Sequence, residues 1–303
     1  MPVHVKCEIR EALRSGMMLR CYAILLATCC FLCGAALAAD FNPDCPTSEH
    51  YQQPHRFGGY VVQLLPGPAA RGSERVEFRC LGTVTPPQGV RKVVAKNWVL
   101  SLDSISGTDV NGDGKPDVVL AGHTSGARCC YEYSIVSLSK PPKLVRQIRT
   151  PLPAVFQSSP TGVEIRLREA AFQYFMLPPD QAVTPLVVVR LEGTKLTDIS
   201  AQRQAEYDEQ ISKAKSELSP DELEKFRQSR YNDKLFTDQL PAVKSVLTIV
   251  LSYLYSGREA QAWQALEEMW PTSDQARIKA VILERRSRGL LNDLITPATK
   301  PAP

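Results

Sequence analysis

Hydrophobic and polar residues alternate with a period of two along much of the chain before Ser200, which is typical of β-strands with one buried face. Segment 163–167 alternates apolar with charged residues, so its charged side should face water. The run at 186–189 is apolar on both sides and predicts a deeper strand, followed by a hairpin turn within 191–196. The predicted strands are 60–65, 76–84, 93–100, 118–121, 131–138, 163–167 and 186–191.

After Ser200 the period changes to that of helices. Ser219 followed by Pro220 predicts a capped helix start. Trp263 and Trp270 are interpreted as core residues rather than as a sugar or peptide platform. The predicted helices are 201–218, one starting at Ser219, one over 243–254 that stops at Gly257, one from Glu259 to Pro271, and one capped by Thr272 or Ser273 that ends at Gly289.

These patterns predict an α+β protein with a mainly antiparallel β domain at 39–200 and an α-helical bundle at 201–295. A Pro-rich tail at 296–303 is predicted to be disordered. Segment 253–266 resembles one tetratricopeptide-type helical hairpin, but only one unit is visible. Because such repeats need about three stacked units, a small bundle packed on the β part is the favoured interpretation.

Composition and charge narrow the function classes. The apolar fraction of 44% and the charged fraction of 22% are those of a globular protein with a packed core. The net charge of +4 is spread along the chain without a long Lys/Arg block. Nucleic-acid binding is therefore disfavoured.

Arg20 precedes an uncharged run at 21–39 that ends in the small-residue pattern Ala36-Leu37-Ala38. This pattern predicts a cleaved signal peptide over 1–38, and hence a periplasmic or secreted protein without a membrane span after cleavage. Three alternatives stay open. They are an uncleaved membrane anchor through 21–39, a lipoprotein signal at Cys29, and a true start at Met17 or Met18.

Signal removal would leave Cys45, Cys80, Cys129 and Cys130 of the nine cysteines. Four cysteines in an oxidising compartment predict two disulfides. We expect Cys80 to pair with one of the adjacent cysteines and Cys45 with the other, although a bond between neighbours Cys129 and Cys130 is an alternative. A redox role lacks the C-x-x-C spacing, and His123 with one cysteine does not define a zinc site.

One segment, the loop at 109–117, has a recognisable pattern of metal-ligating residues. Asp109, Asn111, Asp113 and Asp117 place oxygen-bearing side chains at loop positions 1, 3, 5 and 9, and the backbone carbonyl of Lys115 can join them. Hard Ca²⁺ prefers about six to eight oxygen ligands, and this spacing folds several around one point. A metal-free turn rich in Asp, Asn and Gly is the alternative.

The loop is not an EF-hand, because position 12 is Leu120 and an apolar strand follows instead of a helix. The pattern D-x-N-x-D-G-x-x-D before a strand resembles the calcium loops of FG-GAP and VCBS-type repeats. The resemblance covers about 98–138 and implies Ca²⁺ bound by the four oxygen side chains and the Lys115 carbonyl. A structural role is favoured over a catalytic one, because this ligand set gives little evidence for an open reactive position. The continuation 122–130 looks like a segment of exported bacterial proteins of uncharacterised function.

These observations favour an exported, calcium-binding, non-enzymatic interaction protein with a protein or glycan partner. The alternative is an extracytoplasmic hydrolase acting on glycan or lipid, with His50, His55 and His123 as candidates. No G-x-S-x-G or H-E-x-x-H motif supports that alternative, and no catalytic residue is assigned. The sequence does not indicate an oligomeric state.

Overall fold

The computed structural model describes residues 53–67, 79–124, 130–230 and 239–295. The predicted signal peptide, its alternatives, Cys45, His50, Cys129 and the predicted disordered tail lie outside these ranges. Within the described ranges, no helix is both long and apolar enough to cross a membrane.

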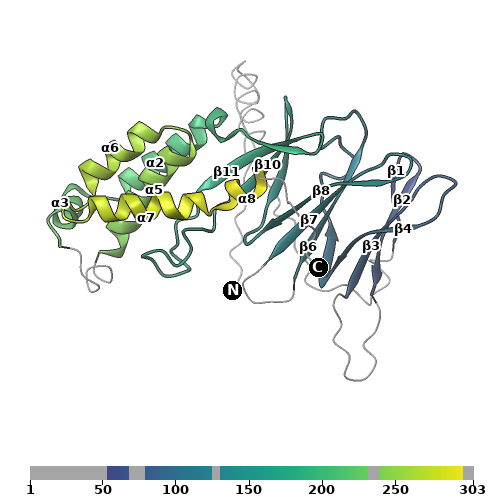
Figure 1. Ribbon diagram of the computed structural model, residues 1–303, viewed down its shortest axis with the longest axis horizontal. Helices are drawn as coiled ribbons and strands as arrows, with labels where there is room; N and C mark the ends of the chain where they lie inside the picture. Colours follow the sequence, from purple (N-terminus) through teal and green to yellow (C-terminus); the bar gives the residue numbers. More distant parts are fainter. Residues whose placement is uncertain (1–52, 68–78, 125–129, 231–238, 296–303) are drawn as a thin grey trace, which may run out of the picture. The chain divides into compact units, whose positions relative to one another are not determined.

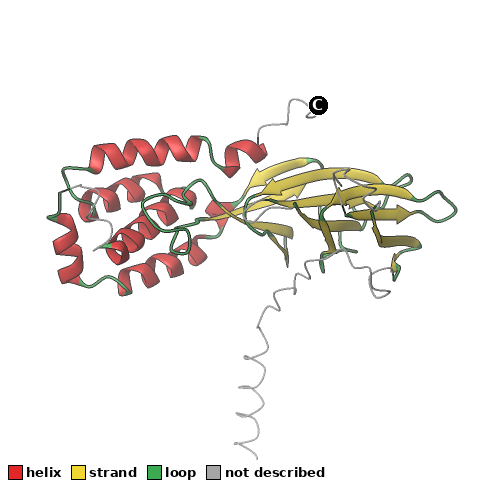
Figure 2. Ribbon diagram, turned by 90° about the horizontal axis from the view of Figure 1, so that it is seen from below, coloured by secondary structure: helices red, strands yellow, loops and turns green. Residues whose placement is uncertain are grey.

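The strands form three antiparallel sheets of four strands each. The strands are drawn as arrows in Figures 1 and 2. Sheet A has the order β1 (His55–Phe57), β2 (Tyr60–Pro66), β3 (Cys80–Thr85), β4 (Lys92–Asn97). Sheet B has the order β5 (Val99–Leu102), β6 (Asp117–His123), β7 (Tyr131–Ser137), β8 (Lys143–Thr150). Sheet C has the order β12 (Lys195–Asp198), β11 (Leu186–Glu192), β10 (Gly162–Arg168), β9 (Val155–Ser159).

The predicted α+β class is confirmed, and each predicted strand overlaps an observed one. The run predicted as one strand over 93–100 is wrong in one respect, because it divides into β4 and β5 at Trp98. The Asn97 side-chain oxygen accepts the Trp98 backbone N–H at 2.8 Å, which diverts that donor from strand pairing. The predicted hairpin is confirmed, with Glu192 paired to Lys195 across Gly193 and Thr194.

Strand β6 is buried on both faces, and this makes sheet B a middle layer. Val118 and Leu120 belong to a core shared with sheet A. Val119 and Ala121, which point the other way, belong to a second core shared with sheet C and the helices. The uninterrupted apolar run of β6 is thus explained by its two covered faces.

The described residues after β12 form helices and the turns between them (Figure 2). The helix that was predicted to start at Ser219 has a capping box, in which the Glu222 N–H donates to Ser219 Oγ at 3.3 Å and the Ser219 N–H donates to Glu222 Oε2 at 3.1 Å. The elements are η2 (Ser200–Gln202), α2 (Gln204–Ser216), α3 (Pro220–Arg227), α5 (Leu240–Tyr255), α6 (Glu259–Met269), α7 (Gln275–Ser287) and α8 (Leu290–Ile295).

The predicted cap of the third long helix is wrong. Helix α7 has Asp274 as its N-cap residue instead of Thr272 or Ser273. The Asp274 carboxylate is buried, where it accepts the Trp270 indole N–H at 3.0 Å. The interpretation of Trp270 as core is confirmed, since it is 1% exposed, and its indole binds the N-cap residue of α7 four positions further on.

The large core runs without a break from sheets B and C into the helices. The last strand ends at Asp198 and the first helical turn begins at Ser200, so the secondary structure changes at the predicted boundary. A division into two domains at this point stays a prediction.

Glu169, just after β10, fastens the strand region to the helices. Its buried carboxylate accepts the Tyr255 hydroxyl of α5 at 3.2 Å and the Leu290 N–H of α8 at 2.8 Å. Burial, followed by the adjacent Glu169 charge, raises the pKa of Tyr255, so the hydroxyl keeps the proton that it donates. A Cβ at Gly289 would lie 2.4 Å from Glu169 Oε2, so this contact requires glycine there.

We expect Gly289→Ala to lower the free energy of unfolding by about 1–3 kcal/mol, because the added methyl displaces a carboxylate that is held by several hydrogen bonds. Urea unfolding measures the change. In a Glu169→Ala background the same substitution should cost less than about 1 kcal/mol, since the clashing oxygen is gone. An equal cost in the two backgrounds would contradict the proposed contact.

Candidate functional site

The 109–117 loop connects β5 to β6 and ends on the first residue of β6. The Asp117 N–H donates to the Thr108 carbonyl at 2.7 Å, and the Gly107 N–H donates to the Asp117 carbonyl at 2.7 Å. These two backbone bonds close the base of the loop. Asp117 is thereby fixed where the loop enters the buried sheet.

Asp109 organises the loop from inside. Its Oδ1 accepts the Gly112 N–H at 2.7 Å and the Asp113 N–H at 3.1 Å, and its Oδ2 accepts the Gly114 N–H at 2.7 Å. Gly112 and Gly114 have φ of 75° and 78°, in the left-handed region that glycine adopts without strain. The two glycines therefore let the backbone wrap around one carboxylate.

Asn111 and Asp113 join the loop to two other strand regions. The Asn111 carbonyl accepts the Gly193 N–H at 2.7 Å, from the turn between β11 and β12. Asp113 Oδ2 accepts the Ser137 hydroxyl of β7 at 3.4 Å, and Asp113 Oδ1 accepts the Lys115 N–H at 2.9 Å. The loop is thus tied to both sheet B and sheet C.

Asp117 is fully buried, and its two carboxylate oxygens differ. Oδ2 accepts the Val110 N–H at 2.8 Å and the Asn111 N–H at 3.2 Å. Oδ1 is buried and has no hydrogen-bond partner among the described residues. Burial raises the pKa of Asp117 to about 6, the two N–H donors oppose this shift, and the charges of Asp113 and Asp109 add to it.

The four predicted side-chain ligands therefore lie in one short loop, together with the Lys115 carbonyl. Hard oxygen donors are what Ca²⁺ binds, and a cation would offset the cost of the buried Asp117 charge. In the part of the chain that the structure describes, however, no three His, Cys, Asp or Glu side chains converge closely enough to hold a metal ion. The Asp109 and Asp113 side chains face loop N–H groups instead, so binding would require them to turn.

Comparisons with protein-family models, with curated proteins and with solved structures found no match for this chain. The resemblance of the loop to FG-GAP and VCBS-type repeats, and that of segment 253–266 to a tetratricopeptide hairpin, consequently stay predictions.

The predicted disulfides are only partly visible. Cys80 and Cys130 are both disulfide-bonded, and no disulfide joins two described residues. Cys80 is fully buried, as its place in the strand pattern predicts. Since Cys45 and Cys129 lie outside the described residues, the pairing stays a prediction.

The structure does not bring the candidate histidines together. His55 is exposed on β1 of sheet A. His123 ends β6 of sheet B, where its ring packs edge-on against Tyr131 with 4.9 Å between centroids. The hydrolase alternative therefore gains no support from the two histidines that are described.

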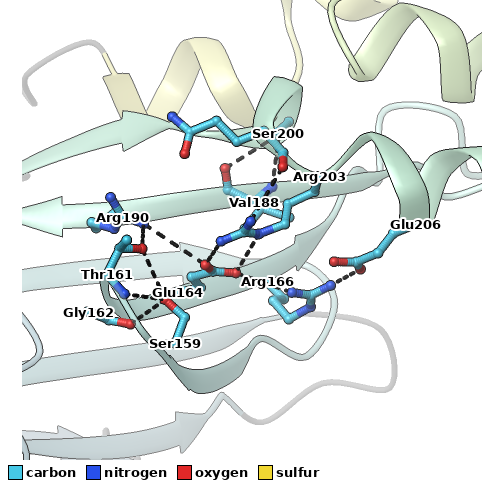
Figure 3. Close-up of polar contacts among 11 residues, drawn as sticks. Ser159, Thr161, Gly162, Glu164, Arg166, Val188, Arg190, Ser200, Arg203 and Glu206 are labelled. Atoms are coloured by element: carbon cyan, nitrogen blue, oxygen red, sulfur yellow. Dashed lines mark hydrogen bonds and ion pairs between the residues drawn. The ribbon is translucent and has the colours of Figure 1, made fainter.

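Sheet C carries a charged cluster that the sequence pattern does not predict (Figure 3). The predicted wet face of β10 is wrong at Glu164, which is buried. Arg203 Nε, from the start of the helical region, donates to Glu164 Oε2 at 2.9 Å, and a second Arg203 nitrogen also binds this carboxylate. Arg166 lies 3.4 Å and Arg190 3.9 Å from Glu164 oxygens, and Arg166 also pairs with Glu206 of α2.

This cluster connects sheet C to the first helix, because the partners of Glu164 come from β10, β11 and the turn before α2. The strand pattern alone could not reveal it, since Arg203 lies 39 positions away from Glu164. A buried carboxylate needs such cations, so the cluster is explained as a structural link between the two regions.

Glu164→Gln should lower the free energy of unfolding by about 1–3 kcal/mol, less than for a fully buried ion pair because the arginines are partly exposed. Chemical denaturation gives the value. As a matched control, Glu224→Gln breaks an exposed pair with Arg227 and should cost about 0–0.5 kcal/mol. Similar costs for the two substitutions would show that the buried cluster adds nothing to stability.

Proposed function

We propose that this chain is an exported calcium-binding protein of the periplasm or cell surface, whose role is to bind a protein or glycan partner rather than to catalyse a reaction. The observation that carries the calcium part is Asp117, which is fully buried with one oxygen lacking a partner among the described residues, beside Asp109 and Asp113. A bound cation would compensate these carboxylates.

The role proposed for Ca²⁺ is structural. The candidate ligands lie in a connection tied to Ser137 of sheet B and to Gly193 of sheet C. A cation there would stabilise the junction of two sheets. Export is supported by the signal-like N-terminal sequence and by the disulfide-bonded state of Cys80 and Cys130, which is typical of oxidising compartments.

Calcium should raise the melting temperature of the purified protein by about 5–10 °C at about 100 times its dissociation constant, because a ligand that binds only the folded state stabilises it by about 2.7 kcal/mol there. Thermal unfolding with Ca²⁺ and with chelator measures this. Asp113→Ala should abolish the shift. Asp180→Ala, which removes an exposed carboxylate outside the loop, should retain it. No calcium shift in the unmodified protein would refute the proposal.

Asp117→Asn tests the buried carboxylate itself. The amide keeps the size of the side chain and an oxygen for the Val110 N–H, but it removes the charge. We expect the calcium-free stability to change by less than about 1 kcal/mol, since the lost charge-burial cost offsets the new amide. The calcium response should disappear. A calcium shift of unchanged size, measured by the same thermal unfolding, would exclude Asp117 as a ligand.

A further inference from the structure

A hollow of about 420 Å³ lies where sheet B, the segment after β10 and the end of the helices meet. Arg149 and Pro151 at the end of β8 form one side. Residues 169–171, 173 and 174 form the second side. Arg288, between α7 and α8, and Leu290, the first residue of α8, form the third. The volume is within the range of small-molecule sites, about 300–1,000 Å³.

The rim of this hollow is cationic. The Arg149 side chain is exposed and makes no hydrogen bond or ion pair within the described residues. The Arg288 side chain is 77% exposed. Among the described residues it contacts only Glu284, which is also exposed, at 2.9 Å. Guanidinium groups bind carboxylates and phosphates through paired N–H donors. Two such groups at one opening favour an anionic ligand.

Glu169, the one acidic residue that lines the hollow, already accepts hydrogen bonds within the fold. Glu169 is buried, and its carboxylate accepts N–H groups of Ala171 at 2.9 Å and Leu290 at 2.8 Å, and the Tyr255 hydroxyl at 3.2 Å. These three donors stabilise its charge within the fold. Glu169 therefore shapes the floor of the hollow and leaves the rim arginines unpaired with it.

An aromatic side chain stands at the same opening. Tyr174 is 53% exposed, which is unusual for so large a side chain, and its backbone has a φ of 58°. The segment is held in place by Arg285, which donates to the Ala171 carbonyl at 2.6 Å and lies 4.6 Å above the Phe175 ring. The wall that presents Tyr174 is thus fixed by contacts to α7, and the hollow is formed in advance of any ligand.

We propose that this hollow binds a small organic anion in which a carboxylate or phosphate is attached to a flat ring. The anionic group contacts Arg149 and Arg288, and the ring packs on Tyr174. A second hollow of about 340 Å³ shares Ala171 and Arg288, and leaves room for a longer ligand along α7. This inference rests on the proposed role as a binding protein and gives that role a ligand class.

Isothermal titration of the purified protein with phenyl phosphate, benzoate and inorganic phosphate tests the proposal. We expect one saturable site for at least one of the two ring-bearing anions, and the preferred one identifies the anionic group. Arg149→Ala and Arg288→Ala should each weaken binding about tenfold or more. Tyr174→Ala should weaken binding of the ring-bearing anion and leave that of inorganic phosphate unchanged.

Arg56→Ala, which removes an exposed arginine on sheet A, is the matched control and should bind like the unmodified protein. Melting temperatures confirm that each variant is folded. The proposal is overturned if neither ring-bearing anion binds the unmodified protein, or if Arg56→Ala weakens binding as much as Arg149→Ala does.

Running every titration with Ca²⁺ and with chelator separates the two proposals. Anion binding without a calcium effect on stability would support the proposed anion site and contradict the proposed metal site. A calcium effect without anion binding would do the reverse.

Discussion

The rest of the structure depends on the burial of sheet B from both sides. Val118 and Leu120 of β6 pack toward sheet A, whereas Val119 and Ala121 pack toward sheet C and the helices. Because neither face of β6 is exposed to solvent, the chain reaches the surface only in the turns at the ends of this strand. Asp117 is the first residue of β6, and it is carried into the interior with the apolar residues that follow it.

Three of the four buried carboxylates among the described residues are stabilised in three different ways. Glu164 is surrounded by arginines, and Glu169 accepts hydrogen bonds from two backbone N–H groups and one hydroxyl. Asp117 has two N–H donors on one oxygen and none among the described residues on the other. Because an uncompensated buried charge is costly, Asp117 is the one of these three at which an added cation would contribute most.

The sequence was informative where one local pattern decides the structure. The apolar face of α5, the capping box at Ser219 and the hairpin at Gly193 follow from spacing alone. The sequence pattern does not predict strands β1, β8 and β9, because most of their residues are polar or exposed. The burial of Glu164 depends on its contact with Arg203, which lies 39 positions away and which no local pattern contains.

In the candidate site, too, some features follow from a local sequence pattern and others from contacts between distant residues. The spacing of its oxygen donors could be recognised in the sequence, whereas the bonds that tie Asp113 to Ser137 and Asn111 to Gly193 depend on how the sheets meet. Those bonds change what a cation would do. In an isolated turn it would order only a few surface residues. Here the same ion would hold together a connection that spans sheets B and C, so its binding energy would act on their packing.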